Sequence, residues 1–401
     1  MPAIAVGMFL TNIAIADEMN TQKDYTYKAN GAGQMNQNES EYYPGSSAGP
    51  ILKNDRSVDV SISAEFLYWM PSMSDLPAIS QINFTPRINL VTGDVLEADA
   101  FTSKTREFDW KYEPAFRVGM GLTFEPNGWD LSAFWTYLYT DVSRSKSNDN
   151  TLLDFSQTPT FPVEQAGSKA YSTPFQRFEG DFGNRARAKF KLLYNQIDLV
   201  VGRNFWVSKS LQMRPFFGAR GVWSHMRLTT KVDVTNALQN PTTTFVRFLS
   251  NHHKLEEWGV GPVIGLNSKW FLHKMFYFYA DGSVALLGNG VALKHKSAEL
   301  DSFTNTVDDT STFSSTTIPT YRHHHSITLI PMFDIALGLG WESYLCQERY
   351  HLAFSAGWDA HILVDYNYFD RSFEETTGQS TYTADGHLSF QGLTVKGRFQ
   401  F

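Results

Sequence analysis

The chain ends in Leu393-Thr394-Val395-Lys396-Gly397-Arg398-Phe399-Gln400-Phe401, and this stretch decides how the rest is interpreted. Counting back from the last residue, every second position is apolar or glycine: Phe401, Phe399, Gly397, Val395 and Leu393. The residues between them are polar or charged. A strict period of two indicates a β-strand whose two faces meet different surroundings. A final strand with aromatic rings on its apolar face is typical of a barrel in a lipid bilayer, where the outer face meets hydrocarbon.

The same alternation recurs in nine earlier runs, at residues 58–68, 116–124, 129–139, 186–203, 211–223, 258–266, 276–286, 327–341 and 350–362. Together the runs predict an all-β fold, a closed antiparallel transmembrane β-barrel of about ten strands. We expect the final strand to close it against residues 58–68. Short alternating pieces such as residues 88–91 leave a count of about 12 to 16 strands open. Within residues 186–203 the apolar phase slips after Leu192, which predicts a bulge near Asn195.

The connectors between the runs alternate in length. Short ones fall at residues 126–128, 207–210, 267–274 and 342–349, whereas long polar ones fall at residues 70–107, 143–185, 227–254, 288–324 and 366–386. Short periplasmic turns and long extracellular loops are typical of outer-membrane barrels. An even number of strands then places both ends of the barrel on the periplasmic side.

Bulk composition narrows the class of protein. Aromatic residues make up 15% of the chain, including 31 Phe, and such residues form belts at membrane interfaces. A net charge of -7 gives no reason to expect a nucleic-acid partner, and no motif calls for a cofactor. The single cysteine, Cys346, excludes an intramolecular disulfide. No segment after the N-terminal region approaches the ~18 apolar residues of a helical span.

The N-terminal region has the pattern of a secretory signal peptide. Residues 1–16 are largely apolar and close on Ala14-x-Ala16, which predicts a signal peptide cleaved after Ala16. No Lys or Arg precedes Lys23, so the charged start of a signal peptide is missing and we expect the true start upstream. Residues 17–56 are polar and aperiodic and are expected to be disordered, and residues 57–401 form the barrel.

A soluble β-sandwich or a lipocalin-like barrel would explain the alternation equally well. It would explain less well the aromatic apolar faces, the small Gly and Ser residues opposite them, the export signal and the terminal Phe401. These features together favour the membrane barrel.

Several segments carry a family resemblance: Glu65-Phe66-Leu67-Tyr68-Trp69, Phe116-Arg117-Val118-Gly119, Gly128-Trp129-Asp130-Leu131, Gly202-Arg203 and Arg214-Pro215-Phe216-Phe217-Gly218. In this order they resemble pore-forming outer-membrane proteins of the Legionella major outer-membrane protein type, also met in chlamydia-like bacteria. The resemblance covers roughly residues 60–400. It implies an integral barrel of the Gram-negative outer membrane that passes small solutes, and it supplies no catalytic residues. The missing charged start departs from the family pattern.

Charged residues on the polar faces define the expected lumen. The candidate pore-lining residues are Arg117, Asp130, Lys189, Asp198, Arg214, Arg220, Glu257, Asp281, Asp334 and Asp359. Charges of both signs across a narrow channel would orient and sort solutes, which predicts a porin for small hydrophilic solutes or ions. The alternative is that the charges pair and plug a small barrel. A structural or adhesive surface barrel, whose long loops contact host or matrix, is a second function.

An outer-membrane hydrolase is a third function. Asp359-x-His361 and His387-x-Ser389 each place two polar residues on one strand face. In a period-two strand such pairs arise easily by chance, so we expect no enzyme. Adjacent strand residues point to opposite faces, so neither His323-His324-His325 nor His252-His253 is expected to bind a metal.

The expected partners follow from the location. They are outer-membrane lipid, small solutes, and the barrel-assembly machinery. We expect that machinery to recognise the C-terminal strand through Leu393, Val395, Phe399 and Phe401. The sequence leaves a homo-oligomer open.

Overall fold

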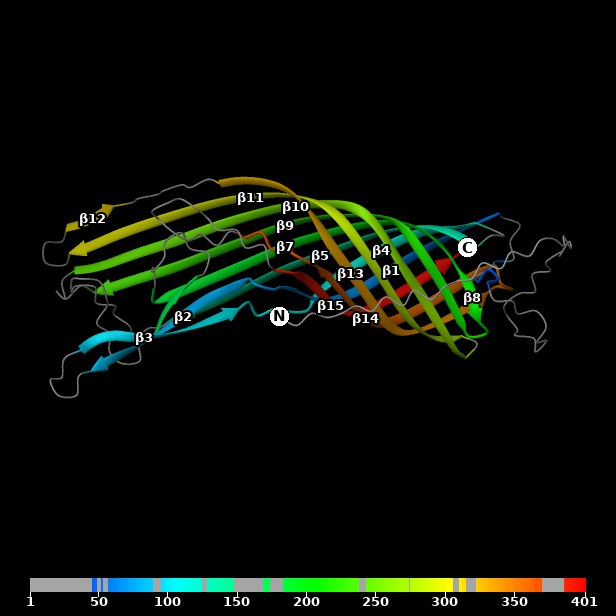
Figure 1. The fold of residues 1–401 in the computed structure, drawn as a ribbon, viewed down its shortest axis with the longest axis horizontal. Coiled ribbons are helices and arrows are strands. Elements are labelled where there is room, and N and C mark those ends of the chain that lie inside the picture. The colour runs from blue at the N-terminus through cyan, green and yellow to red at the C-terminus, as the bar shows by residue number, and fades with distance from the viewer. Residues whose placement is uncertain are drawn as a thin grey trace, which may run out of the picture. The chain divides into compact units, whose positions relative to one another are not determined.

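The chain folds into β-strands, and ten of them close into an antiparallel barrel in the computed structural model (Figure 1). The structure describes residues 45–48, 52, 57–88, 95–124, 128–147, 169–173, 183–237, 243–273, 275–305, 310–314, 322–369 and 386–401. All lie within one unit, residues 32–401. Among the residues so described, no helix is long and apolar enough to cross a membrane.

The barrel strands pair in the order in which they occur in the chain. They are β1 (Val58–Met73), β4 (Glu113–Phe124), β5 (Trp129–Ser147), β7 (Arg185–Arg203), β9 (Leu211–Ala237), β10 (Thr243–His273), β11 (Phe276–Asn305), β13 (Arg322–Leu345), β14 (Tyr350–Leu363) and β15 (Leu388–Gln400). The prediction of a closed all-β barrel of about ten strands is confirmed.

Five further strands lie outside the barrel wall. Strands β2 (Pro77–Ile88), β3 (Val95–Glu107) and β6 (Lys169–Ser172) form a separate three-stranded sheet. Strand β8 (Phe205–Ser208) pairs with β9, and β12 (Thr310–Ser314) pairs with β11. The additional alternating pieces in the connectors therefore do not widen the barrel.

The terminal strand closes the barrel against the first strand, as predicted. Strand β15 pairs antiparallel with β1 from Ser61↔Gln400 to Met73↔Leu388. Beyond that ladder, the backbone of Val60 and Phe401 exchanges two hydrogen bonds, of 3.0 and 2.9 Å. The outward face of β15 carries Leu393 and Val395, each 42% exposed. Lipid-facing alternation thus continues to the end of the chain.

The two ends of the barrel differ in how their strands are joined. We call the end that carries Val58 and Phe401 the turn end, because β4–β5, β10–β11 and β13–β14 are joined there by short turns. The opposite end is the loop end. At the turn end the segment 45–48 forms backbone hydrogen bonds with Asn204 and Trp206, so this part of the expected disordered tail is ordered.

Several strands are much longer than a bilayer requires. Strands β9, β10 and β11 contain 27, 31 and 30 residues, whereas a membrane-spanning strand needs roughly 9–11. They run through most of residues 227–254 and 288–305, where the sequence predicted polar loops, and that prediction was wrong. Likewise β10 continues to His273, so most of the predicted turn at residues 267–274 is strand.

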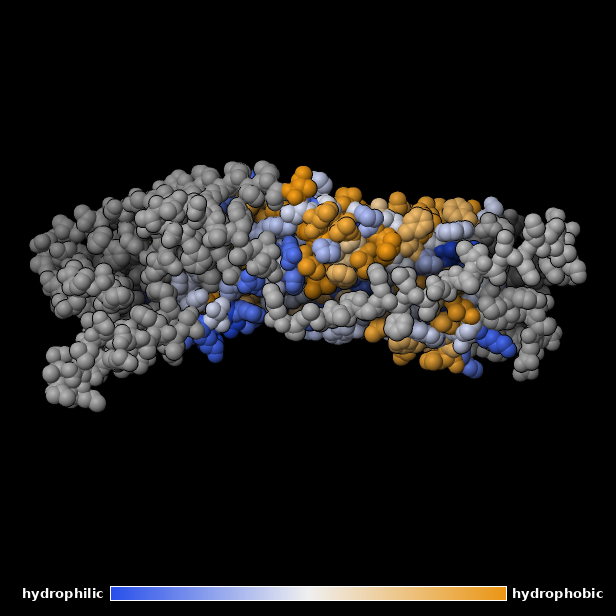
Figure 2. All heavy atoms as spheres, viewed as in Figure 1, coloured by the Kyte–Doolittle hydropathy of each residue, from blue (hydrophilic) through white to orange (hydrophobic). Residues whose placement is uncertain are grey.

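The reason for the error is an inversion of the two faces along each strand. In the part of the barrel nearer the turn end, which we call the turn half, outward side chains are apolar and exposed, such as Ile197 at 45% and Leu199 at 49%. Figure 2 shows hydrophobic side chains gathered along the barrel, with hydrophilic ones beside them. In the part nearer the loop end, the loop half, the apolar side chains turn inward and charges face out.

Strand β7 shows the inversion most clearly. Ala186, Ala188, Phe190 and Leu192 are each no more than 2% exposed, and they face the interior on the same side as Asp198. The backbone register runs unbroken past Tyr137↔Asn195 and Asn195↔Trp223. The predicted bulge near Asn195 was therefore wrong, because the strand changes its surroundings and not its pairing.

Candidate functional site in the barrel interior

An arginine bridges the barrel interior between strands that are not neighbours. Arg220 on β9 donates from Nε to Asp198 Oδ1 on β7 at 2.6 Å. Its Nη1 donates to Asp334 Oδ2 on β13 at 2.5 Å. Strands β10 and β11 separate β9 from β13 in the wall, so the second contact crosses the lumen. Because both carboxylates are engaged by one buried guanidinium, this group ties β7 and β9 to β13, a strand that neither of them pairs with.

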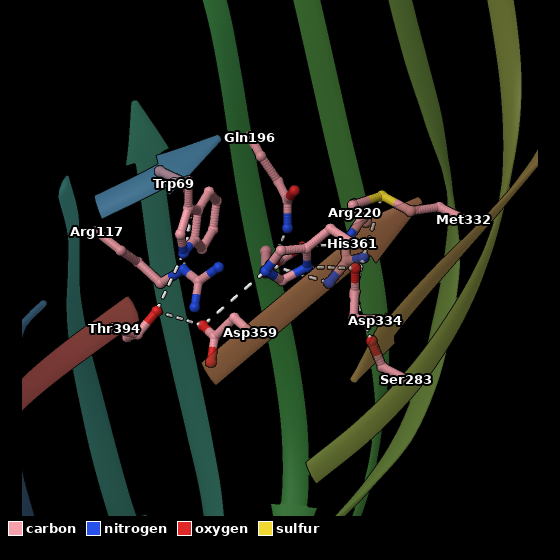
Figure 3. Close-up of polar contacts among 12 residues, drawn as sticks. Trp69, Arg117, Gln196, Arg220, Ser283, Met332, Asp334, Asp359, His361 and Thr394 are labelled. Atoms are coloured by element: carbon pink, nitrogen blue, oxygen red, sulfur yellow. Dashed lines mark hydrogen bonds and ion pairs between the residues drawn. The ribbon is translucent and has the colours of Figure 1, made fainter. Parts of the chain in front are cut away.

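A histidine extends this network along β14 (Figure 3). His361 Nδ1 lies 2.7 Å from Asp334 Oδ1, and its Nε2 lies 4.0 Å from Asp359 Oδ2. The His361 ring packs on Trp69, with the two ring centroids 4.5 Å apart. On the other side, Thr394 Oγ1 donates to Asp359 Oδ2 at 2.7 Å and accepts from Trp69 Nε1 at 3.1 Å. The interior polar groups of six strands are thus linked into one chain of contacts.

A second group surrounds Glu65 on β1. Arg117 Nη1 donates to Glu65 Oε2 at 3.0 Å, and Lys396 Nζ lies 3.0 Å from Glu65 Oε1. The guanidinium of Arg117 also lies 5.5 Å from the ring centroid of Trp69, a cation–π distance. This glutamate therefore joins the first, second and last strands of the barrel where the wall closes.

Two further pairs lie toward the turn end. Arg214 Nε donates to Asp130 Oδ2 at 2.7 Å, and its Nη1 donates to Asn267 Oδ1 at 2.9 Å. Lys269 Nζ donates to Glu342 Oε2 at 2.8 Å. Arg214–Asp130 and Lys269–Glu342 thus join opposite charges, as expected when charges are removed from bulk water.

Water nonetheless reaches the interior of the turn half. The inward side chains of Lys396 and Lys269 are 37% and 33% exposed, although the carboxylate that Lys396 contacts is only 3% exposed. Three small inward residues of the same half are also partly exposed: Ser63, Ala336 and Ser355. The rings of Phe134 and Tyr279 fill the space over Gly119 and Gly338. We call this water-accessible part of the lumen the vestibule.

The interior of the loop half is closed by apolar packing. The largest side chains with less than 2% exposure include Trp69, Tyr194, Phe190 and Phe390, and they belong to one continuous cluster. Tyr194 and Phe390 pack with ring centroids 4.7 Å apart. We call this cluster the apolar plug. Each large side chain buried there contributes about 1.5–3 kcal/mol of hydrophobic stabilisation.

Nine of the ten candidate pore-lining residues face the interior: Arg117, Asp130, Asp198, Arg214, Arg220, Glu257, Asp281, Asp334 and Asp359. Lys189 does not, and its prediction as a pore-lining residue was wrong. Its side chain is 47% exposed on the outer face and lies 3.0 Å from Asp141. Lys189 belongs to the loop half, where the polar face of the strand is the outer one.

The histidine runs behave as strand residues do. His252 is exposed on the outer face, whereas the adjacent His253 is buried, so the two rings lie on opposite faces. The side chains of residues 323–325 lie outside the described part of the chain. Among the described residues, no group of three His, Cys, Asp or Glu side chains is arranged to hold a metal ion.

Sequence reasoning missed three interior residues that organise the site. Glu65 alternates with Ser61 and Ser63 on the polar face of the first run, and this alternation could have identified it. Thr394 likewise alternates with Lys396 on the polar face of the last run. Trp69 carried no such signal, because it acts through contacts between strands that only the closed barrel brings together. Lys396 and Arg398, on the polar face of the last run, also face inward, and Arg398 Nη2 lies 3.3 Å from Ser61 Oγ.

His387 and Ser389, the second candidate catalytic pair, form hydrogen bonds with other residues and not with each other. Ser389 Oγ lies 2.7 Å from Ser72 Oγ. His387 Nδ1 accepts a hydrogen bond of 3.1 Å from the backbone N–H of Asp365. Neither contact joins the histidine to the serine.

A comparison with protein families decides what this barrel is. The family model described as Legionella pneumophila major outer membrane protein precursor matches residues 55–401. The chain belongs to this family. As a member, with a closed barrel of ten strands, it is an integral outer-membrane protein that crosses the membrane many times.

Solved outer-membrane proteins are similar at low identity. The outer membrane protease OmpT from Escherichia coli is 8% identical, with a TM-score of 0.33 over 88% of this chain and 98% of that chain. The Pseudomonas putida toluene transporter TodX is 8% identical, with a TM-score of 0.25 over 85% and 89%. A Pseudomonas aeruginosa FadL homologue is 5% identical, with a TM-score of 0.23 over 86% and 90%. No curated protein matches the chain. At this level of identity and TM-score, the likeness assigns no activity to this chain.

Proposed function

We propose that this chain is a narrow porin that lets small hydrophilic solutes or ions cross the outer membrane. The observation that carries the proposal is the vestibule, where the side chains of Lys269 and Lys396 face the lumen and are still 33% and 37% exposed. Charges of both signs along the same interior would orient a solute as it enters. Membership of a major outer-membrane protein family supports the location.

The apolar plug gives the proposed porin a gate. Hydrophobic constrictions close water-filled paths by dewetting, so ions pass only when the constriction widens or becomes wet. Phe390 belongs to this cluster, is 1% exposed, and packs on Tyr194 and Trp69. We therefore expect small conductance steps separated by long closures.

Planar-bilayer recording of the purified, folded protein tests the proposal. Phe390→Ser should place a hydroxyl in the constriction, and channels should then open more often than in the unchanged protein. Ser389→Ala, one residue away on the outer face, is the matched control and should leave opening unchanged. A well-folded sample that gives no conductance steps, with or without Phe390→Ser, would contradict a porin.

A structural or adhesive barrel is the second candidate, and the packing of the loop half favours it. An apolar core that fills long strands beyond the membrane forms a stiff support for the connections at the loop end. Removing residues 150–168 should then abolish attachment of cells to host or matrix surfaces. If attachment falls while conductance persists, the two roles are separate.

We further propose that the interior network does not catalyse hydrolysis. Arg220 engages Asp198 and Asp334, and His361 is held against Asp334 and Trp69. Groups committed to cross-barrel contacts are poorly placed to activate water on a substrate. Asp359→Ala and Ser389→Ala should leave cleavage of peptides and lipids at the level of the unchanged protein, and a loss in either would contradict this.

A further inference from the structure

A row of cations crosses four neighbouring strands on the outer face of the loop half. In the ladder, Lys191 on β7 lies directly opposite Arg227 on β9. Arg227 lies opposite Lys254 on β10, and Lys254 lies opposite Lys294 on β11. All four point outward, because the alternate residues of these strands form the apolar plug.

More basic residues flank this row. We call the whole set the cationic belt: Lys189, Lys191, Arg227, Lys231, Lys254, Lys294 and Lys296. Asp141 contacts Lys189 and Lys191, and Glu256 contacts Lys254. Seven cations against these two carboxylates leave an excess of five positive charges. Within the described part of the chain, no carboxylate forms an ion pair with Arg227, Lys231, Lys294 or Lys296.

Like charges placed directly opposite each other destabilise an antiparallel ladder. The belt repeats this unfavourable arrangement across three successive strand pairs. The local field also acts on His252, whose pKa lies below its ordinary value because of partial burial and then the charges of Lys231, Lys296 and Arg227. A surface of this kind is stabilised by an anion that lies between the cations.

The height of the belt indicates where that anion comes from. Trp223 and Trp258 face each other on the outer wall, and Trp258 is 58% exposed. Such tryptophans mark the boundary between hydrocarbon and headgroups. Arg227 and Lys254 lie four residues farther toward the loop end on the same two strands, about 13 Å along the strand at ~3.3 Å per residue. That is the level of lipid headgroups, beyond the hydrocarbon.

We propose that the cationic belt binds phosphate groups of lipids in the outer leaflet. Phosphate oxygens would lie between Arg227, Lys254 and Lys294 and offset their mutual repulsion, while the acyl chains of the same lipid would lie along the apolar outer face below the two tryptophans. Arg227 offers a planar guanidinium for two parallel hydrogen bonds, and the lysines act as point charges. The site is thus selective for a lipid that combines phosphate with acyl chains.

Binding of diphosphoryl lipid A to the full-length barrel in uncharged detergent micelles tests the proposal. The triple variant Arg227→Gln, Lys254→Gln, Lys294→Gln removes three of the charges. At ~1 kcal/mol for each basic residue near an anionic lipid surface, its affinity should fall about 100-fold. The matched control is Arg203→Gln, Lys209→Gln, Arg349→Gln, which removes three exposed cations near the turn end and should bind as the unchanged protein does.

Two comparisons identify the source of the phosphate. Lipid A without phosphates should bind the unchanged protein and the triple variant equally weakly. Inorganic phosphate should bind the unchanged protein much more weakly than diphosphoryl lipid A does. Equal affinity of the triple variant and the control for diphosphoryl lipid A would overturn the proposal. So would inorganic phosphate that binds as tightly as the lipid, or lipid A that binds equally with and without phosphates.

Thermal unfolding without added lipid gives an independent result. Because the triple variant relieves repulsion among opposed cations, its Tm should equal or exceed that of the unchanged protein. A lower Tm would contradict the repulsion on which the proposal rests. If the triple variant does not fold, the single variants Arg227→Gln and Lys294→Gln replace it, each with an expected loss of about fivefold in affinity.

Discussion

The turn half and the loop half of this barrel are made from the same strands but have opposite interiors. In the turn half the lumen holds Glu65, Arg117 and Asp198, and the outer face is apolar. In the loop half the interior holds Phe190 and Leu192, and the outer face carries cations. Strand period is identical in both, so the solvent outside the wall decides which face is polar. Within the bilayer a strand places its apolar side chains outward, as membrane barrels do. Beyond the bilayer the same strand places them inward, as soluble barrels do.

The largest expected effect compares neighbours on β7 in the loop half. Phe190 is 0% exposed and packs against the rings of Phe108, Trp110 and Phe369. Phe190→Asp would bury an unpaired charge and remove an aromatic side chain. It should lower the free energy of unfolding by about 5 kcal/mol or prevent folding. Urea unfolding in detergent micelles measures the change.

The matched control is Lys189→Asp, one residue earlier on the outer face. It should change the free energy of unfolding by no more than about 1 kcal/mol, because Lys189 and its partner Asp141 lie on the outer face with side chains 47% and 30% exposed. If Lys189→Asp proved as damaging as Phe190→Asp, the assignment of inner and outer faces in the loop half would be wrong.

The next effect concerns the bridge across the lumen. Arg220→Met would leave Asp198 and Asp334 without their shared cation and should cost about 3–5 kcal/mol of stability. Adding Asp198→Asn and Asp334→Asn to this variant should restore most of the loss, because no unpaired charge then remains. A triple variant as unstable as Arg220→Met would show that the guanidinium acts through packing alone.

A smaller stability effect is expected at the end of the chain. Removing Phe401 deletes one aromatic ring that packs on Phe399, with centroids 5.8 Å apart, and two backbone hydrogen bonds to Val60. The assembled barrel should lose no more than about 2 kcal/mol. Insertion by the assembly machinery should fall more sharply than conductance, as judged from heat-modifiable migration of membrane-inserted protein in vivo. If the variant without Phe401 inserted normally, Phe401 would not be part of the signal that the assembly machinery recognises.

The fold was accessible from sequence because alternation is a local signal. Ten runs predicted ten strands, and the terminal run identified its partner on β1. Lys189, the bulge near Asn195 and the loops at residues 227–254 were misassigned for one reason: a single polarity was assumed for the lumen along the whole strand. The contacts from Arg220 to Asp334 and from His361 to Trp69 were not accessible, because barrel closure and strand stagger bring them together.

Thiol accessibility tests the contrast between the two halves most directly. With the exposed Cys346 replaced by Ser, single cysteines are placed on the inner face at Ser355 in the vestibule and at Ala188 in the apolar plug. A small, charged, membrane-impermeant thiol reagent should modify Ser355→Cys rapidly and leave Ala188→Cys unmodified while the barrel is folded. Equal rates of modification at the two positions would contradict a wet vestibule closed by a dry plug.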